Sequence, residues 1–145
     1  MPPLSCNEGP RSRFPSSIFL DAALRNLELW AGNGIAPPHA DPILVSGTPP
    51  APVLDEFGNV QGGLRSPYLD VPTSTWFGSS TGASFCFIAG HEVPFSHEKL
   101  RELYPTHGRY VWAVAKDTLN LVKQRIITAP DGVQLVRDAA RADVP

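Results

Sequence analysis

The residues with the clearest chemical potential lie at 78–82, where the sequence reads GSSTG. This stretch fits the pattern G-x-S-x-G, in which a serine stands on a sharp turn between a strand and a helix and its hydroxyl acts as a nucleophile. Attack by such a serine needs a histidine as general base and an acidic residue that orients the histidine. A catalytic role for Ser80 therefore requires that the sequence also provide the strand, the helix, the histidine and the acidic residue.

That sequence does not supply the rest of the arrangement. Residues 73–77 (TSTWF) have the composition of a strand, but residues 83–90 (ASFCFIAG) are rich in strand formers and favour no helix. In hydrolases with this pattern the acid and then the histidine follow the serine, whereas here Asp117 follows the last histidine, His107. The alternative partners for Ser80 on another fold are His91, His97 and His107. We expect Ser80 to be a loop residue, and we assign no catalytic residue to this chain.

Two residues are candidates for substrate binding. Arg65 carries a planar guanidinium that can hold a carboxylate with two parallel hydrogen bonds, although Asp70 is near enough in sequence to take it as an ion pair instead. Trp76 offers a large flat surface for an apolar group, although tryptophan is more often a core residue. We predict both as walls of a substrate pocket, with these structural roles as the alternatives.

Composition narrows the possible partners. The chain has 145 residues, 42% hydrophobic and 18% charged, with a formal net charge of -2. No block of Lys or Arg is present, which disfavours nucleic acid as a partner, and no apolar run is long enough to cross a bilayer. No spacing of His, Cys, Asp or Glu predicts a metal site, and no motif predicts a cofactor. The compartment stays unknown.

The two cysteines, Cys6 and Cys86, are far apart in the sequence. Cys86 lies in the apolar run Phe85-Cys86-Phe87-Ile88, which favours a buried and inert thiol. A Cys6–Cys86 disulfide is the alternative, and it would require an oxidising compartment.

The pattern of elements predicts an α+β fold that is mainly helical. Twelve of the 16 prolines lie at or before Pro72, so we expect residues 1–95 to be irregular with one helix and short strands, and residues 96–145 to be helical, within a single domain. The first helix should bury an apolar stripe that includes Leu20, Leu24 and Leu27, and the last should bury Val133, Val136 and Ala140. The predicted elements are helices at 17–31, 96–104, 106–125 and 130–141, a connector at 36–52, a hairpin at 53–60, and strands at 73–77 and 85–88.

The order of several short motifs resembles the C-terminal part of the large alpha/beta hydrolase domain-containing proteins. The resemblance runs from about Cys6 to the end of the chain. The motifs that carry it are Cys6-Asn7-Glu8-Gly9-Pro10, Ala22-Ala23-Leu24 with Leu27 and Trp30, Gly34 with Pro37-Pro38, Asp55-Glu56-Phe57-Gly58-Asn59, Gly62-Gly63-Leu64-Arg65, Leu69-Asp70-Val71-Pro72-Thr73, Phe85-Cys86, Pro94-Phe95, Leu103-Tyr104-Pro105-Thr106-His107 and Tyr110.

The resemblance implies that the nucleophile and the catalytic histidine lie upstream of this segment. The chain would then be the C-terminal fragment of an α/β-hydrolase-type fold that supports the hydrolase core and shapes its pocket. Its partners would be that upstream core and a small-molecule ester or amide substrate. The alternatives are a non-enzymatic binding module that uses exposed aromatic residues, and a self-contained hydrolase that uses Ser80. If a neighbouring core is missing, the chain should expose a contiguous apolar patch.

Overall fold

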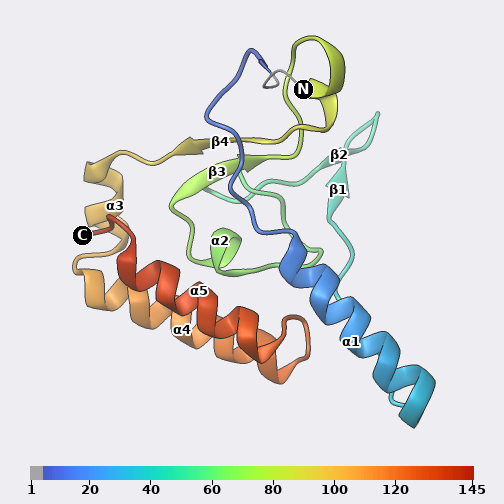
Figure 1. Ribbon diagram of the computed structural model, residues 1–145. Helices are drawn as coiled ribbons and strands as arrows, with labels where there is room; N and C mark the ends of the chain where they lie inside the picture. The colour runs from blue at the N-terminus through green and yellow to red at the C-terminus, as the bar shows by residue number, and fades with distance from the viewer. Residues whose placement is uncertain (1–4) are drawn as a thin grey trace.

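The computed structural model describes residues 5–145, so the first four residues of the predicted irregular half lie outside the described residues. The described chain has an α+β arrangement of five α-helices and two small antiparallel sheets (Figure 1). The four predicted helices are present, and α2 is an additional short one. The elements are α1 (Ser17–Asn33), β1 (Val45–Ser46), β2 (Ala51–Pro52), α2 (Pro67–Asp70), β3 (Ser74–Phe77), the 3-10 helix η1 (Ser84–Ile88), β4 (His91–Pro94), α3 (His97–Leu103), α4 (His107–Lys123) and α5 (Ala129–Arg141).

Side-chain caps fix the starts of the last three helices. The Ser96 hydroxyl accepts a hydrogen bond from the Lys99 backbone N–H at 3.2 Å, as its place before α3 predicts. The hydroxyl of Thr106 does the same for α4, and that of Thr128 for α5. These caps satisfy N–H groups that have no partner within the helix, so the sequence defines these boundaries locally.

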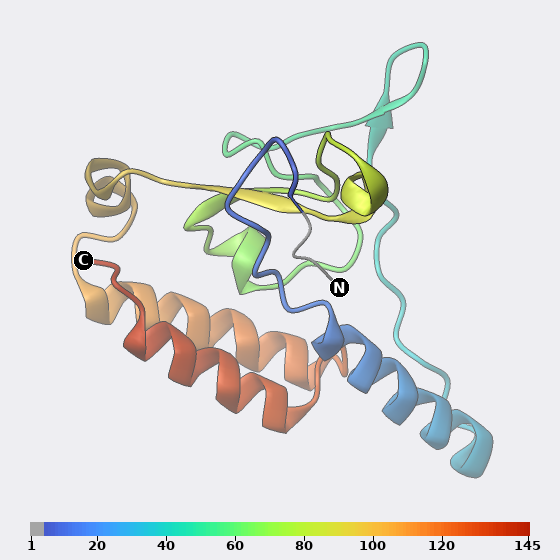
Figure 2. The same ribbon diagram turned by 45° about the horizontal axis from the view of Figure 1, so that its top comes forward.

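α4 and α5 lie side by side and antiparallel (Figures 1 and 2). Gly132 lets the two helices approach closely, because a Cβ atom there would stand 2.9 Å from Cγ2 of Val122. The buried face of α5 consists of Gly132, Leu135 and Ala139. The predicted face was wrong by one position along the helix: Val133 and Ala140 are exposed, because the glycine itself faces α4.

Most of the buried hydrophobic residues in the described chain belong to two clusters. The first joins α2, α3, α4 and α5 around Val114, and the second joins the start of α1 to the turn between α4 and α5 around Ile127. Most of the apolar core therefore lies against α4 and α5. The first cluster contains Val71, Leu100, Tyr104, Tyr110, Val114, Ala139 and Val144, and the second contains Ile18, Leu121, Ile126, Ile127 and Leu135.

α1 is present but buries a different face from the predicted one. Its buried residues are Ile18, Ala22 and Asn26, whereas the side chains of the predicted apolar stripe are exposed. Figures 1 and 2 both show α1 projecting beyond the rest of the molecule. The exposed fractions are 66% for Leu20, 63% for Leu24, 56% for Leu27 and 56% for Trp30. We call these four side chains the α1 apolar face.

The predicted strand at 73–77 is present as β3, whereas the predicted strand at 85–88 is not. β3 pairs antiparallel with β4, with Trp76 opposite Glu92 and Phe77 opposite His91. Residues 84–88 form η1 instead of a strand, and Phe85 and Phe87 point to solvent. A strand needs a neighbouring strand for its backbone hydrogen bonds. Because β4 pairs with β3, residues 84–88 have no such neighbour in β3.

Two hairpins lie before α2. The predicted turn after Asp55 is present: the Leu54–Val60 bridge closes it, and Gly58 has a φ of 77° that favours glycine. The predicted connector at 36–52 contains a second, exposed hairpin formed by β1 and β2.

No helix in the described part of the chain combines the length and apolarity that a bilayer crossing requires.

Candidate functional site

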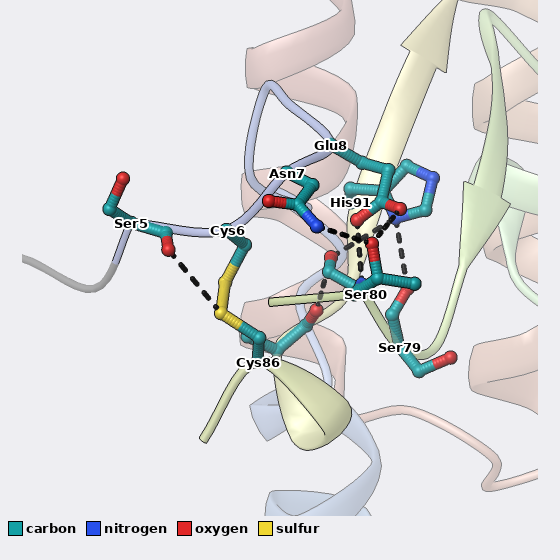
Figure 3. The surroundings of a disulfide bond; sticks show 10 residues. Ser5, Cys6, Asn7, Glu8, Ser79, Ser80, Cys86 and His91 are labelled. Carbon is teal, nitrogen blue, oxygen red and sulfur yellow. Dashed lines mark hydrogen bonds between the residues drawn. A yellow bond between two sulfur atoms is a disulfide. The ribbon is translucent and has the colours of Figure 1, made fainter. Parts of the chain in front are cut away.

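The two cysteines form a disulfide, which corrects the prediction of a free thiol at Cys86 (Figure 3). The Cα atoms of Cys6 and Cys86 are 5.6 Å apart, and Cys86 is completely buried as predicted. The N-terminal segment runs antiparallel to the loop after β3, with a bridge between Cys6 and Gly82 and a hydrogen bond from the Asn7 N–H to the Thr81 carbonyl. This pairing brings together two cysteines that are 80 positions apart.

Ser80 lies next to this disulfide and also close to a histidine. Its Oγ is 3.1 Å from Nδ1 of His91, and the serine is 9% exposed. The serine hydroxyl donates a hydrogen bond to the Ala89 carbonyl at 2.7 Å (Figure 3). The hydroxyl proton is therefore directed to a backbone oxygen and not to the imidazole.

The histidine has a similar backbone partner. Nδ1 of His91 is 2.9 Å from the carbonyl oxygen of Ser79, which can only accept a hydrogen bond. This contact requires a proton on Nδ1, whereas a general base must present an unprotonated nitrogen to the serine hydroxyl. His91 also stacks on Phe77, with ring centroids 4.4 Å apart. These contacts link Ser80 and His91 to the backbone and to Phe77 within the loop 78–91 and β3.

Glu8 is the acidic residue nearest to this pair in Figure 3, but it binds Thr81. Its carboxylate accepts hydrogen bonds from the Thr81 N–H at 2.7 Å and from the Thr81 hydroxyl at 2.6 Å. These two bonds lower the pKa of Glu8 below its usual value, and the nearby His91 adds a small effect in the same direction. Glu8 thus anchors the N-terminal segment to the loop and makes no hydrogen bond to the imidazole.

The backbone around Ser80 also differs from a nucleophile elbow. β3 ends at Phe77, and the next helical residues are those of the short η1, which begins at Ser84. Among the described non-glycine residues, positive φ occurs at Ser84 and Arg125 and not at Ser80. The serine therefore lacks the strained turn into a helix that an elbow uses.

The other two histidines considered as partners lie elsewhere. His97 is exposed in the first turn of α3. His107 begins α4, and its Nδ1 is 2.8 Å from the carbonyl oxygen of Val144, so it ties the start of α4 to the end of the chain. Neither makes a hydrogen bond to Ser80 within residues 5–145.

Arg65 connects the hairpin at 54–60 to α2. Its guanidinium pairs with Asp70, donates to the carbonyl oxygens of Val60 and Leu69 at 2.7 and 3.1 Å, and lies 3.5 Å from the Asp55 carboxylate. The Arg65–Asp70 pair is the structural alternative that the sequence offered. The fork that would bind a substrate carboxylate is already occupied by these groups.

Trp76 lines a cavity of about 490 Å³ between the β3–β4 sheet and the pair α4–α5. Its indole N–H donates to the Tyr68 carbonyl at 2.9 Å, and its ring meets the Tyr68 ring edge to face with centroids 5.3 Å apart. Arg65 lines a different cavity, of about 590 Å³, beside Asp41 and Gln61. The structure therefore does not bring the two predicted substrate-binding residues into one pocket.

Two tyrosines to which the sequence assigned no substrate-binding role, Tyr68 and Tyr110, also line the first cavity. Burial raises the pKa of both phenols, and the Asp138 carboxylate raises that of Tyr68 further. Tyr68 lies between Pro67 and Pro72 in a stretch that carries no catalytic motif, so no sequence signal pointed to it. Within the described residues, no cluster of three or more His, Cys, Asp or Glu side chains has an arrangement that could hold a metal ion.

Comparison with known proteins identifies a family. No curated protein and no solved structure matches the sequence. A family model described as alpha/beta hydrolase domain matches residues 1–137. Because this match covers nearly all of the sequence, the chain belongs to the alpha/beta hydrolase domain family, as the ordered motifs predicted.

Proposed function

We propose that this chain is the C-terminal portion of a serine hydrolase of the α/β-hydrolase type, which acts on an ester or an amide. The chain is not catalytic alone; it supports the hydrolase core and shapes the substrate pocket. The observation that carries this proposal is the α1 apolar face. A row of four large apolar side chains on an otherwise well-formed helix costs free energy in water, and such surfaces mark interaction sites.

The candidate site supports a non-catalytic role. The protons of Ser80 and His91 are directed to the carbonyls of Ala89 and Ser79, and Glu8 is bound to Thr81. A hydrolase in which this chain takes part would then need its nucleophile and base from the upstream core. Within this proposal Trp76 is a pocket wall. Arg65 acts by holding the hairpin at 54–60 against α2, and its contact with substrate stays a prediction.

The test is assembly with a hydrolase core. The upstream region of a family member is produced as a separate polypeptide, and hydrolysis of p-nitrophenyl acetate is measured with and without this chain. We expect hydrolysis only in the mixture. Leu24→Asp should weaken the assembly because it places a charge on the α1 apolar face, whereas Trp112→Asp, on an exposed position of α4, is the matched control. A correctly folded assembly without hydrolysis would contradict the proposal and favour a binding module.

A second candidate is a self-contained hydrolase that uses Ser80, because its Oγ lies 3.1 Å from an imidazole nitrogen. A fluorophosphonate probe on this chain alone distinguishes the two candidates. We expect no labelling. Labelling that Ser80→Ala abolishes and Ser79→Ala preserves would support the second candidate instead.

A further inference from the structure

The cavity beside Trp76 has the size of a small-molecule site. Its volume of about 490 Å³ lies within the range of roughly 300–1,000 Å³ that is usual for such sites. Residues from β3, α2, α4 and α5 line it, among them Trp76, Tyr68, Tyr110 and Leu135. The adjacent elements α2 and β3 thus form one hollow together with α4 and α5, which begin thirty or more positions later in the sequence.

One wall of the cavity is aromatic and held in place. The Trp76 ring packs against Tyr68 on one side, and Phe14 packs edge to face on both rings, with centroids 5.8 Å and 5.7 Å away. The hydrogen bond from the Trp76 indole to the Tyr68 carbonyl fixes the indole orientation. A rigid aromatic wall loses little conformational entropy when a flat apolar group packs against it.

Two of the residues that line the cavity, Tyr68 and Tyr110, have hydroxyl groups without a hydrogen-bond partner in the described part of the chain. Tyr104, which does not line the cavity, donates its hydroxyl to the Pro72 carbonyl at 2.9 Å. A phenol is protonated at neutral pH, and burial raises the pKa of both tyrosines further, so each hydroxyl is a neutral donor for an acceptor atom of a ligand.

The arginines and the carboxylates that line the cavity are equal in number. The Arg13 guanidinium binds the buried Glu92 carboxylate, and the Asp138 carboxylate accepts a hydrogen bond from the Gln134 amide at 2.8 Å. Two guanidinium groups (Arg13 and Arg141), two carboxylates (Asp138 and Asp143) and the imidazole of His97 line the cavity. A charged ligand would lose hydration and find no excess of opposite charge, so the cavity favours an uncharged one.

We propose that this cavity binds an uncharged ester or amide that carries an aromatic ring. The ring packs on Trp76, and the carbonyl oxygen accepts a hydrogen bond from the hydroxyl of Tyr68 or Tyr110. This inference rests on the proposed function, because it names the substrate class of the pocket that this chain shapes.

The test uses the full chain alone and three probes of nearly equal shape: benzamide (uncharged), benzamidine (cationic) and benzoate (anionic). In ¹⁵N-labelled chain, the Trp76 indole N–H signal reports the cavity. Trp30 and Trp112 lie on exposed faces of α1 and α4 and serve as internal controls. We expect benzamide to shift the Trp76 signal in a saturable way and to bind about tenfold more tightly than either charged probe.

Removal of single hydroxyls tests the binding mode. Tyr68→Phe and Tyr110→Phe break no hydrogen bond within the described residues, so both should fold, and at least one should bind benzamide about three- to tenfold more weakly. Tyr104→Phe is the matched control: it loses the hydrogen bond to Pro72 and should keep its affinity for benzamide.

The results separate this inference from the proposed function. A folded chain whose Trp76 signal does not respond to benzamide, or one that binds a charged probe more tightly, overturns the ligand class. The same holds if both phenylalanine variants keep full affinity. Failure of hydrolysis in the assembly experiment would overturn the proposed function while these binding results stand.

Discussion

α1 and α4 are both 17 residues long, yet their apolar faces have opposite surroundings. α4 buries Tyr110, Val114 and Leu121 against the rest of the chain. α1 exposes the α1 apolar face and is held at Ile18, at Ala22 and by the hydrogen bond from the Asn26 amide to the Arg125 carbonyl. Helical periodicity identifies the apolar face of a helix, but it does not say whether the partner of that face belongs to the same chain.

The helical region formed by α4 and α5 and the region before α3 also differ in the contacts that hold each of them together. α4 and α5 pack directly on each other and contribute to both buried clusters. The region before α3 has two short sheets, and residues 39–52 are exposed throughout. A region with so little buried apolar area depends more on single covalent and polar contacts between distant segments, such as the disulfide and the Glu8–Thr81 hydrogen bonds.

Removal of the disulfide should change the free energy of unfolding more than any other variant that tests this difference between the two regions. The double variant Cys6→Ala/Cys86→Ala frees a loop of about 80 residues in the unfolded chain, so we expect it to lower the free energy of unfolding by about 4 kcal/mol. Urea denaturation measures this loss, and a reducing agent should produce the same loss in the unchanged chain but no further loss in the variant.

Hydrogen exchange shows which segments of the chain lose stability in the double variant. Amides at 7–12 and 80–92 should lose protection in the double variant, whereas those of α4 and α5 should keep most of theirs. Equal loss of protection in α4 and α5 would show that the two regions unfold as one unit and would remove the contrast drawn between them.

A pair of leucine truncations compares the two apolar faces directly. Leu135→Ala removes a buried side chain between α5 and its neighbours and should cost about 3 kcal/mol. Leu24→Ala, on the α1 apolar face, should change the free energy of unfolding of this chain by less than about 0.5 kcal/mol. A cost for Leu24→Ala close to that of Leu135→Ala would mean that α1 is already covered in solution, for instance by a second copy.

Much of the fold could be predicted from the sequence because its signals are local. Ser96, Thr106 and Pro105 set helix boundaries through caps and a missing N–H, and Gly58 sets a turn through its positive φ. The buried face of α5 was not predictable by periodicity alone, because Gly132 has no side chain for a hydrophobicity pattern to register.

The candidate site depended on contacts that the sequence does not reveal. The Cys6–Cys86 bond and the Ser80–His91 contact both arise because the N-terminal segment and β4 come to lie beside the loop after β3. The cavity of Trp76 likewise needs α5, which lies more than fifty positions later in the sequence. The GSSTG pattern, by contrast, could be judged locally, because no helix begins directly after Ser80 and the next helical segment, η1, starts at Ser84.

A smaller change in the free energy of unfolding than that of the disulfide or of Leu135 is expected where the two regions meet. Asp117 of α4 faces Asp70 and Arg65, and one of its carboxylate oxygens is buried without a hydrogen-bond partner in the described chain. Burial and, to a lesser degree, the Asp70 charge raise the pKa of Asp117 from 3.8 to about 6, and Arg65 opposes this shift. The folded chain then binds this proton more tightly than the unfolded chain does.

The sign of the pH dependence follows from that difference. The contribution of Asp117 to stability is complete below its unfolded pKa of 3.8 and is lost as the pH rises to about 6. Asp117→Asn, which stays neutral, should therefore raise the free energy of unfolding at pH 7 by about 1 kcal/mol, a value kept small because the carboxyl is partly exposed. Urea denaturation at pH 4 should show almost no difference between the two chains. An equal rise in the free energy of unfolding at both pH values would show that the shape of the amide causes it and not the loss of the carboxylate charge. Asp117 would then not be a site of electrostatic strain between the two regions.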